Sequence, residues 1–105
     1  MADIMKILQQ AQEMQGRFQK IQEELQRVTV SGSAGGGMVT VEANGQGAVQ
    51  RVKIDPSVVN PGDVEMLEDL VLVAVTEAQK KAQAQAQQEL GKLTGGLPLP
   101  FKLPF

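Results

Sequence analysis

The stretch SGSAGGGMVTVEANGQG, residues 31–47, decides how the chain folds, because its glycines either turn the backbone or cradle a phosphate. A phosphate loop needs glycines after a strand and at the start of a helix, so that backbone N–H groups and the helix dipole converge on the anion. Here GSAGGG is followed by MVTV, an alternating run that is typical of a strand. The glycines are therefore predicted to lie in two hairpin turns. A turn tip that offers N–H groups to a nucleic-acid phosphate stays the alternative.

Three short runs of alternating β-branched residues surround these turns and predict an antiparallel meander. The residues expected on the core face are Val28 and Val30, then Val39, Val41 and Ala43, then Val52 and Ile54. Arg51 and Lys53 alternate with the last pair and should lie on the outer face, where Glu42 could pair with them. With NGQG as the loop, the expected neighbours are Ala43–Ala48, Val41–Gln50, Val39–Val52 and Thr40–Arg51. An even loop length is needed, because a slip of one residue would turn the valines to water.

The N-terminal segment has the spacing of a long amphipathic helix. Its apolar residues alternate at intervals of three and four: Ile4, Ile7, Ala11, Met14, Phe18, Ile21, Leu25 and Val28. This is a heptad seam over four heptads. Gly16 falls on the outermost side of the helix, where it costs about 1 kcal/mol relative to Ala but disturbs no packing.

A second long helix is predicted after IDPSVVNPGD. Either Asn60 caps it, with Pro61 at the first helical position, or Asp63 does. The helix should run to about Leu90. Its run LVLVAV, residues 70–75, is apolar all round and should be buried on more than one side. We therefore expect an obligate dimer, in which changing Leu70 and Val71 to Asp abolishes folding as well as dimerisation.

The end of the chain, GKLTGGLPLPFKLPF, is punctuated by Pro and Gly and cannot be helical beyond Gly95. The sequence thus predicts an α+β fold: a long helix, a three-stranded antiparallel β-meander, a long helix and a Pro-rich tail. Residues 1–95 would form a single α-β-β-β-α domain and residues 96–105 the tail. The tail should pack rather than hang free, since its leucines and phenylalanines are apolar and its prolines lower the entropy lost on docking. A disordered tail is the alternative.

Composition argues against an enzyme. The chain has no Cys, His, Trp or Tyr, so the usual general base, thiolate nucleophile and soft-metal ligands are missing. An active site made only of lysines or carboxylates is the remaining enzymatic alternative. We expect no cofactor, no metal and no small-molecule substrate. The longest apolar run is too short to cross a bilayer and no signal peptide is evident, which favours a soluble cytoplasmic protein without a membrane partner.

Charge is segregated along the chain although the net charge is only −2. Residues 55–77 hold six acidic residues and no basic one, whereas residues 78–105 hold four lysines and one glutamate. Such segregation matters more than the sum for the choice of partner. The candidate DNA-binding residues are Arg17, Lys20, Arg27, Lys80, Lys81 and Lys92. The simpler interpretation is that they are ordinary solvated charges on helices.

The whole chain resembles the YbaB/EbfC family of bacterial nucleoid-associated proteins. The stretches that carry the resemblance are MKILQQAQEMQGRFQKIQEELQ, the glycine hairpin with ANG, RVKIDPSVV followed by EMLEDLVLVAV, and the closing GKLTGGLPLP and FKLPF. The resemblance implies a small homodimer with protruding helices, likened to tweezers, that binds double-stranded DNA in the cytoplasm and influences nucleoid organisation.

Contact with DNA would be mainly to phosphates and of low sequence specificity, because no single patch looks like a base-reading recognition helix. A prefoldin-like chaperone or an interaction scaffold is the second hypothesis, since it too would present long helices joined through β-hairpins.

Overall fold

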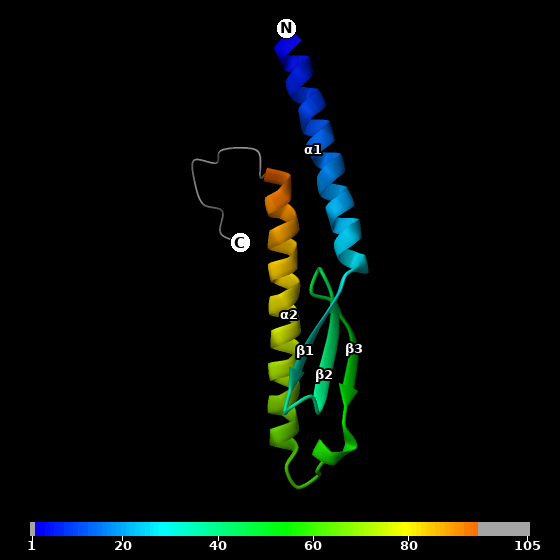
Figure 1. The fold of residues 1–105 in the computed structure, drawn as a ribbon, viewed down its shortest axis with the longest axis vertical. Helices are drawn as coiled ribbons and strands as arrows, with labels where there is room; N and C mark the ends of the chain where they lie inside the picture. Colours follow the sequence, from blue (N-terminus) through cyan, green and yellow to red (C-terminus); the bar gives the residue numbers. More distant parts are fainter. Residues whose placement is uncertain (1, 95–105) are drawn as a thin grey trace.

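In the computed structural model of the chain, residues 2–94 are described. The elements in chain order are α1 (Ala2–Arg27), β1 (Thr29–Ala34), β2 (Val39–Asn44), β3 (Val49–Ile54), a 3₁₀ turn (Pro56–Val58) and α2 (Val64–Thr94). The predicted helix, antiparallel three-stranded sheet and second helix are confirmed (Figure 1). The tail expected over residues 96–105 lies outside the described residues, so the division into domain and tail stays a prediction.

Helix α1 is attached to the rest of the molecule only near its C-terminal end. Every residue from 3 to 20 is exposed, whereas Leu25 is buried. The Leu25 carbonyl oxygen accepts a hydrogen bond from Gly45 N at 2.7 Å. A side chain at Gly45 would place its Cβ 2.7 Å from that oxygen, so glycine is required for the close approach. The N-terminal part of α1 therefore projects from the sheet (Figure 1).

The sheet has the order β1-β2-β3 and is antiparallel throughout. The expected pairing of β2 with β3 was wrong by two residues over much of its length. The observed neighbours are Val39–Ile54, Thr40–Lys53, Val41–Val52, Glu42–Arg51 and Ala43–Val49. Because the slip is even up to the bulge between Glu42 and Ala43, the valines keep the predicted face.

The turn between β2 and β3 explains the shifted register. Asn44 Oδ1 accepts hydrogen bonds from Gln46 N at 2.9 Å and Ala48 N at 3.0 Å, which holds the turn closed as far as Ala48. Gln50 is then the extra residue of a β-bulge, because Arg51 pairs with Glu42 and Val49 with Ala43. The spacing of NGQG alone did not predict these two hydrogen bonds to the Asn44 side chain.

The glycines of the opening stretch serve two purposes. Gly35, Gly36, Gly37 and Gly47 have φ between 64° and 90°, which confirms the two predicted hairpin turns. Gly32 does not turn the chain, because β1 continues to Ala34, beyond Val30, the last residue of this strand that was expected on the core face. It lies against the backbone of α2, where the Cβ of any other residue would collide with Ala74 O and Ala78 N.

Helix α2 begins after Asp63, whose Oδ1 accepts a hydrogen bond from Met66 N at 3.2 Å. Asp63 is thus the N-cap, and Asn60 instead accepts from Gly62 N in the preceding loop. Asp55 caps the 3₁₀ turn in the same way, and the hydrogen bond from Ser57 N lowers the pKa of its carboxyl group. The helix ends at Thr94, beyond the expected Leu90.

The core lies where α2 crosses the sheet. Its buried residues are small or β-branched: Ala34, Val39, Val41, Ala43, Ala74 and Ala78. Alanines on α2 let the helix approach the strands closely. The helix covers β1 and β2, whereas every residue of β3 is exposed. Val52 and Ile54 face the same side as Val41 and Val39, yet no described element covers them.

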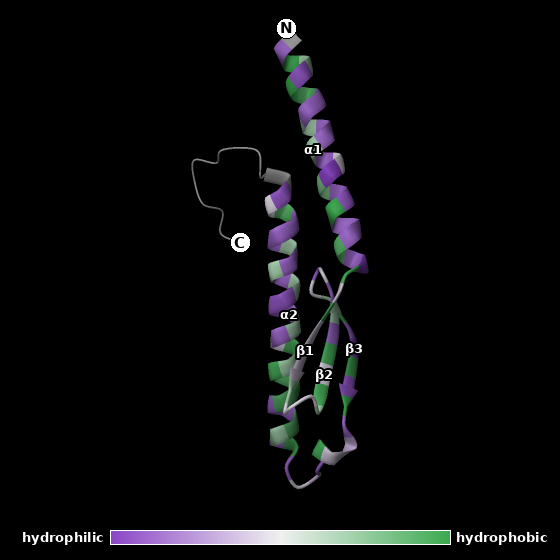
Figure 2. Cartoon of the chain, in the orientation of Figure 1, coloured by the Kyte–Doolittle hydropathy of each residue, from purple (hydrophilic) through white to green (hydrophobic). Residues whose placement is uncertain are grey.

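The expectation that residues 70–75 are buried on more than one side is not met within the single chain. Ala74 is fully buried, whereas Leu72 and Val73 remain 65% and 53% exposed. Over residues 70–75, one face of α2 packs on the sheet, whereas Leu72 and Val73 lie on its exposed sides. Figure 2 colours in green the hydrophobic residues that occur along β3 and the first half of α2.

Candidate nucleic-acid interface

The six candidate DNA-binding residues are all exposed, but they do not form one patch. Three of them come together where α1 and α2 run side by side, and we call Arg17, Lys20 and Lys92 the basic cluster. They line a recess of about 240 Å³ together with Ile21, Glu24 and Glu89. Lys92 Nζ lies 3.3 Å from Glu89 Oε1.

The basic cluster keeps part of its charge available for a ligand. Of the ion pairs among the described residues, none involves Arg17 or Lys20. Three cations face two carboxylates around the recess, so its net charge is positive but modest. Such a surface suits the evenly spaced phosphates of a nucleic acid better than it suits a single strongly bound anion.

The remaining candidates lie apart. Lys81 Nζ is 3.3 Å from Glu77 Oε1 along α2. Lys80 is the next residue and points in another direction, since adjacent residues are about 100° apart on a helix. Arg27 ends α1 beside the sheet. The sequence therefore identified the cations, but only the packing of the helices shows which of them share a surface.

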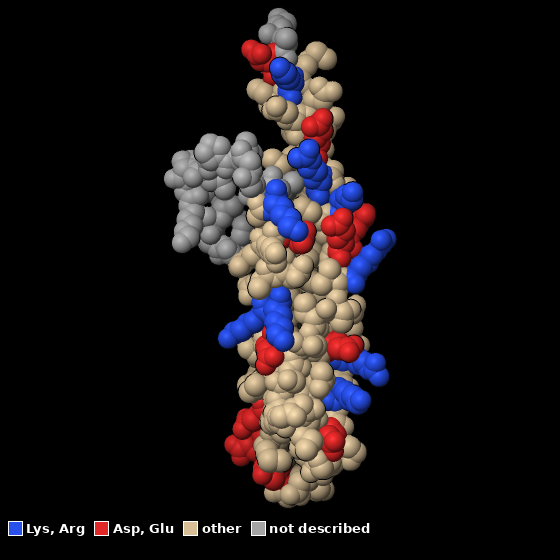
Figure 3. Space-filling model, viewed as in Figure 1, with Lys and Arg blue, Asp and Glu red and all other residues tan. Residues whose placement is uncertain are grey.

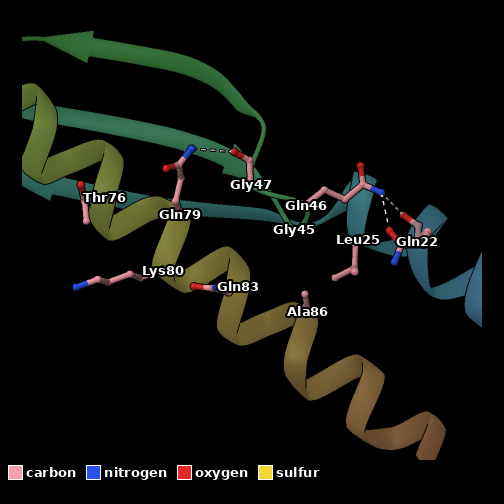
Figure 4. Close-up of a pocket in the computed structure, with 10 residues that line it drawn as sticks. All are labelled: Gln22, Leu25, Gly45, Gln46, Gly47, Thr76, Gln79, Lys80, Gln83 and Ala86. Carbon is pink, nitrogen blue, oxygen red and sulfur yellow. Dashed lines mark hydrogen bonds between the residues drawn. The ribbon is translucent and has the colours of Figure 1, made fainter. Parts of the chain in front are cut away.

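A larger cleft, which the sequence did not indicate, lies between the end of α1, the β2–β3 turn and α2 (Figure 4). It has a volume of about 630 Å³. Amide side chains dominate its lining: Gln22, Gln46, Gln79 and Gln83, with Lys80 and Thr76. Gln79 Nε2 donates to Gly47 O at 3.3 Å, and Gln46 Nε2 donates to Gln22 Oε1 at 3.0 Å.

One signal in the sequence could have revealed this cleft. Leu72, Thr76, Gln79, Gln83 and Ala86 are spaced by three and four residues and therefore share one face of α2. Gln79 fixes the direction of that face, because its hydrogen bond reaches the turn that begins β3. Glutamines of the segment AQKKAQAQAQQ, residues 78–88, therefore continue the face of α2 that begins at Leu72.

The outer face of the sheet carries a third charged group. Arg51 and Lys53 line a shallow recess of about 280 Å³ with Thr40 and Glu42. Glu42 is the direct cross-strand neighbour of Arg51. Figure 3 shows a group of acidic residues at the end where α2 begins, whereas basic and acidic residues alternate along the helices farther from that end. The acidic segment is thereby kept away from the basic cluster.

The described part of the chain offers neither a metal site nor a membrane span. Among residues 2–94, no three or more Asp, Glu, His or Cys side chains are grouped as metal ligands would be. None of the described helices is both long and apolar enough to cross a membrane.

Comparison with known proteins places this geometry in context. The model of the YbaB/EbfC DNA-binding family matches residues 1–97. A nucleoid-associated protein of Gemmatimonas aurantiaca is 58% identical over 103 residues, which cover 98% of this chain and 99% of that protein. A nucleoid-associated protein of Agrobacterium fabrum is 47% identical over 107 residues and the full length of both chains.

A solved structure supports the fold independently. The crystal structure of the uncharacterized protein HP0035 from Helicobacter pylori superposes with a TM-score of 0.77. The match covers 85% of this chain and 94% of that chain at 22% identity. At this identity the likeness concerns the fold alone.

Proposed function

Because the chain belongs to the YbaB/EbfC DNA-binding family, we propose that it is a nucleoid-associated protein that binds double-stranded DNA as a homodimer. The observation that carries the proposal is the basic cluster, where cations from two helices gather on one surface. The family is named for DNA binding and not for a catalytic activity. The proposed function needs no catalytic residue, cofactor or small-molecule substrate, and its place is the nucleoid in the bacterial cytoplasm.

Binding is proposed to be mainly to phosphates and of low sequence specificity. The cations of the basic cluster are spread along two helices, and Glu24 and Glu89 lie among them. Sequence readout needs several side chains that reach base edges within one groove, whereas phosphate contacts only fix position. Phe18 is the aromatic residue nearest the cluster in sequence, but it belongs to the apolar seam of α1, so stacking on single-stranded bases is not supported.

The homodimer is proposed to form through the surface that α2 leaves open, which we call the open apolar face: Val49, Val52 and Ile54 of β3 with Leu72 of α2. These side chains are between 37% and 65% exposed. Leu72 lies two helical turns before Gln79, which bonds to the turn that begins β3, so both parts of the face lie on the same side of the molecule.

A second copy of the chain fits this face for two reasons. An exposed apolar surface of this kind marks an interaction site in a water-soluble protein. In addition, β3 is an edge strand that no other strand pairs with among residues 2–94 on its outer side, and a small sheet gains from further cover. The face lies at the sheet end of the molecule (Figure 1), so both copies could keep their basic clusters free for DNA.

Changing Arg17 and Lys20 together to Ala is expected to weaken DNA binding without altering sequence preference. Each phosphate that the variant no longer neutralises should reduce the slope of log affinity against log salt concentration by about 0.9. The measurement is a mobility shift over a salt series with a duplex of mixed sequence. Lys80 and Lys81 changed together to Ala form the second variant, and Arg51 and Lys53 changed together form the control.

The sheet variant should bind as the unchanged protein does, because its cations line a separate recess on the outer face of the sheet and not the recess of the basic cluster. If both helix variants bind normally while the sheet variant loses affinity, the DNA surface is the outer face of the sheet. Circular dichroism of each variant checks that the fold is retained.

A chaperone or scaffold is the second candidate, and one observation favours it. The exposed apolar side chains of α1, such as Ile4 and Ile7, are 63% exposed and could hold an unfolded client. An unfolded protein added to the mobility shift distinguishes the two functions. Competition with DNA at stoichiometric amounts would favour the chaperone, whereas DNA binding that ignores the client supports the first proposal.

A further inference from the structure

The N-terminal half of α1 carries an apolar stripe that neither the sheet nor α2 covers. We call Ile4, Ile7, Ala11, Met14 and Phe18 the α1 stripe. Ile4 and Ile7 are 63% exposed and Phe18 is 45% exposed, and Met5 and Leu8 widen the surface beside them. The α1 stripe lies along α1 beyond its contacts with α2 and the sheet, at the opposite end of the molecule from β3 (Figure 1), so the open apolar face proposed for the dimer is a separate surface.

The position where α2 ends determines what can reach the α1 stripe. Helices α1 and α2 run in opposite directions, and α2 runs beside the C-terminal part of α1 and ends beside its middle (Figure 1). Lys92 and Glu89 line the same recess as Arg17 and Lys20, so the last turn of α2 lies beside the C-terminal end of the stripe. A chain that continues from Thr94 in the direction of α2 would pass along the rest of the stripe toward Ile4.

The eleven residues 95–105 that follow α2 have the length and the chemistry for this path. From Met14 to Ile4 the helix rises about 15 Å. Eleven residues in an extended, proline-rich conformation span about 34 Å. Their apolar residues recur at every second position: Leu97, Leu99, Phe101, Leu103 and Phe105. Three prolines lie between them and reduce the entropy lost when the segment is ordered.

We propose that residues 97–105 dock on the α1 stripe of the same chain and bury it. The segment then covers the apolar surface that the sheet and α2 leave open, and it fixes the direction in which α1 projects. The proposal explains why a helix with a full heptad seam is packed at only one end. It also removes the apolar surface on which a chaperone function would depend.

The first test measures amide hydrogen exchange in the full-length chain. Phe101 and Phe105 changed together to Ser should speed exchange of residues 5–14 by about tenfold or more, because docking no longer protects them. Residues 39–44 of the sheet should exchange as before, which shows that the variant is folded. Lys102→Ser is the matched control in the same segment and should leave the helix protected. Unchanged exchange of residues 5–14 in the Phe101 and Phe105 variant overturns the proposal.

The second test identifies which copy of the segment binds. The chain has no cysteine, so Asp3→Cys, at the N-terminal end of the α1 stripe, with Lys102→Cys introduces a single pair. Oxidation should join the pair within one chain, as denaturing electrophoresis would show. The control pairs Lys102→Cys with Glu23→Cys, which lies on the other side of α1, and should not close. Disulfides that form only between chains would mean that the partner's segment occupies the α1 stripe. If no disulfide forms in either variant, residues 97–105 do not dock on the α1 stripe. Both results contradict the proposal.

Discussion

Replacing Leu72 with Asp should convert the proposed dimer into folded monomers. Leu72 is 65% exposed in the single chain, so the change removes no core packing. At a two-fold interface the new carboxylate would be buried twice without a partner, and each such charge costs about 3–5 kcal/mol. Sedimentation at micromolar concentration should therefore show a monomer, while circular dichroism shows an unchanged fold. Val52→Asp on β3 should act in the same way.

Val73→Asp is the matched control for Leu72→Asp. Val73 is 53% exposed on the same helix, but it points about 100° away from Leu72 and outside the open apolar face. It should remain dimeric. A dimer that survives Leu72→Asp and dissociates with Val73→Asp would place the interface on the other side of α2.

The structure also sharpens the prediction for Leu70 and Val71, which the sequence selected as dimer contacts. Both pack against the core cluster of the single chain. Changing them to Asp should therefore unfold the protein whether or not a dimer forms, so these variants cannot report on dimerisation alone. Hydrophobic periodicity does not separate Leu70, Val71 and Leu72, because the run is apolar all round.

What the sequence could predict follows from local rules. Spacing of three and four indicated α1, alternation indicated the three strands and their core face, and a side-chain acceptor before the helix indicated Asp63 as one of two caps. The spacing of residues did not predict the β2–β3 register or the extension of β1 to Ala34. Both depend on specific contacts that the spacing alone does not determine. Asn44 closes its turn through two hydrogen bonds, and Gly32 is needed by the backbone of α2.

The candidate site also combines features that local sequence predicts with features that depend on tertiary contacts. The sequence identified six cations, but it could not tell that Lys92 lies beside Arg17 while Lys81 pairs with Glu77. That arrangement depends on where α2 crosses the sheet and how far it then runs along α1. Gly32 lets β1 lie close against α2, and Gly45 lets the β2–β3 turn lie close against the end of α1, so these backbone contacts help to position both helices on the sheet.

Gly32→Ala should be among the most destabilising single changes in the chain. The new Cβ would lie closer than 3.0 Å to backbone atoms of Ala74 and Ala78, a separation that real Cβ atoms essentially never show. Backbone atoms cannot rotate away as a side chain could, so β1 and α2 must separate and the core between them loosens. Overpacking of this kind costs about 1–3 kcal/mol and occasionally more. For a domain of this size each kcal/mol lowers the melting temperature by about 4–8 °C.

Gly16→Ala is the control, because nothing lies within 4 Å of a Cβ at that position. Alanine there should raise helix stability by about 0.5–1 kcal/mol, since glycine loses more entropy in a helix. Thermal unfolding followed by circular dichroism measures both variants. If Gly32→Ala melts with the unchanged protein, β1 and α2 are not in contact as described. The two glycines look alike in the sequence, but Gly32 is required by the backbone of a helix that passes over it, whereas Gly16 is required by nothing that the structure places near it.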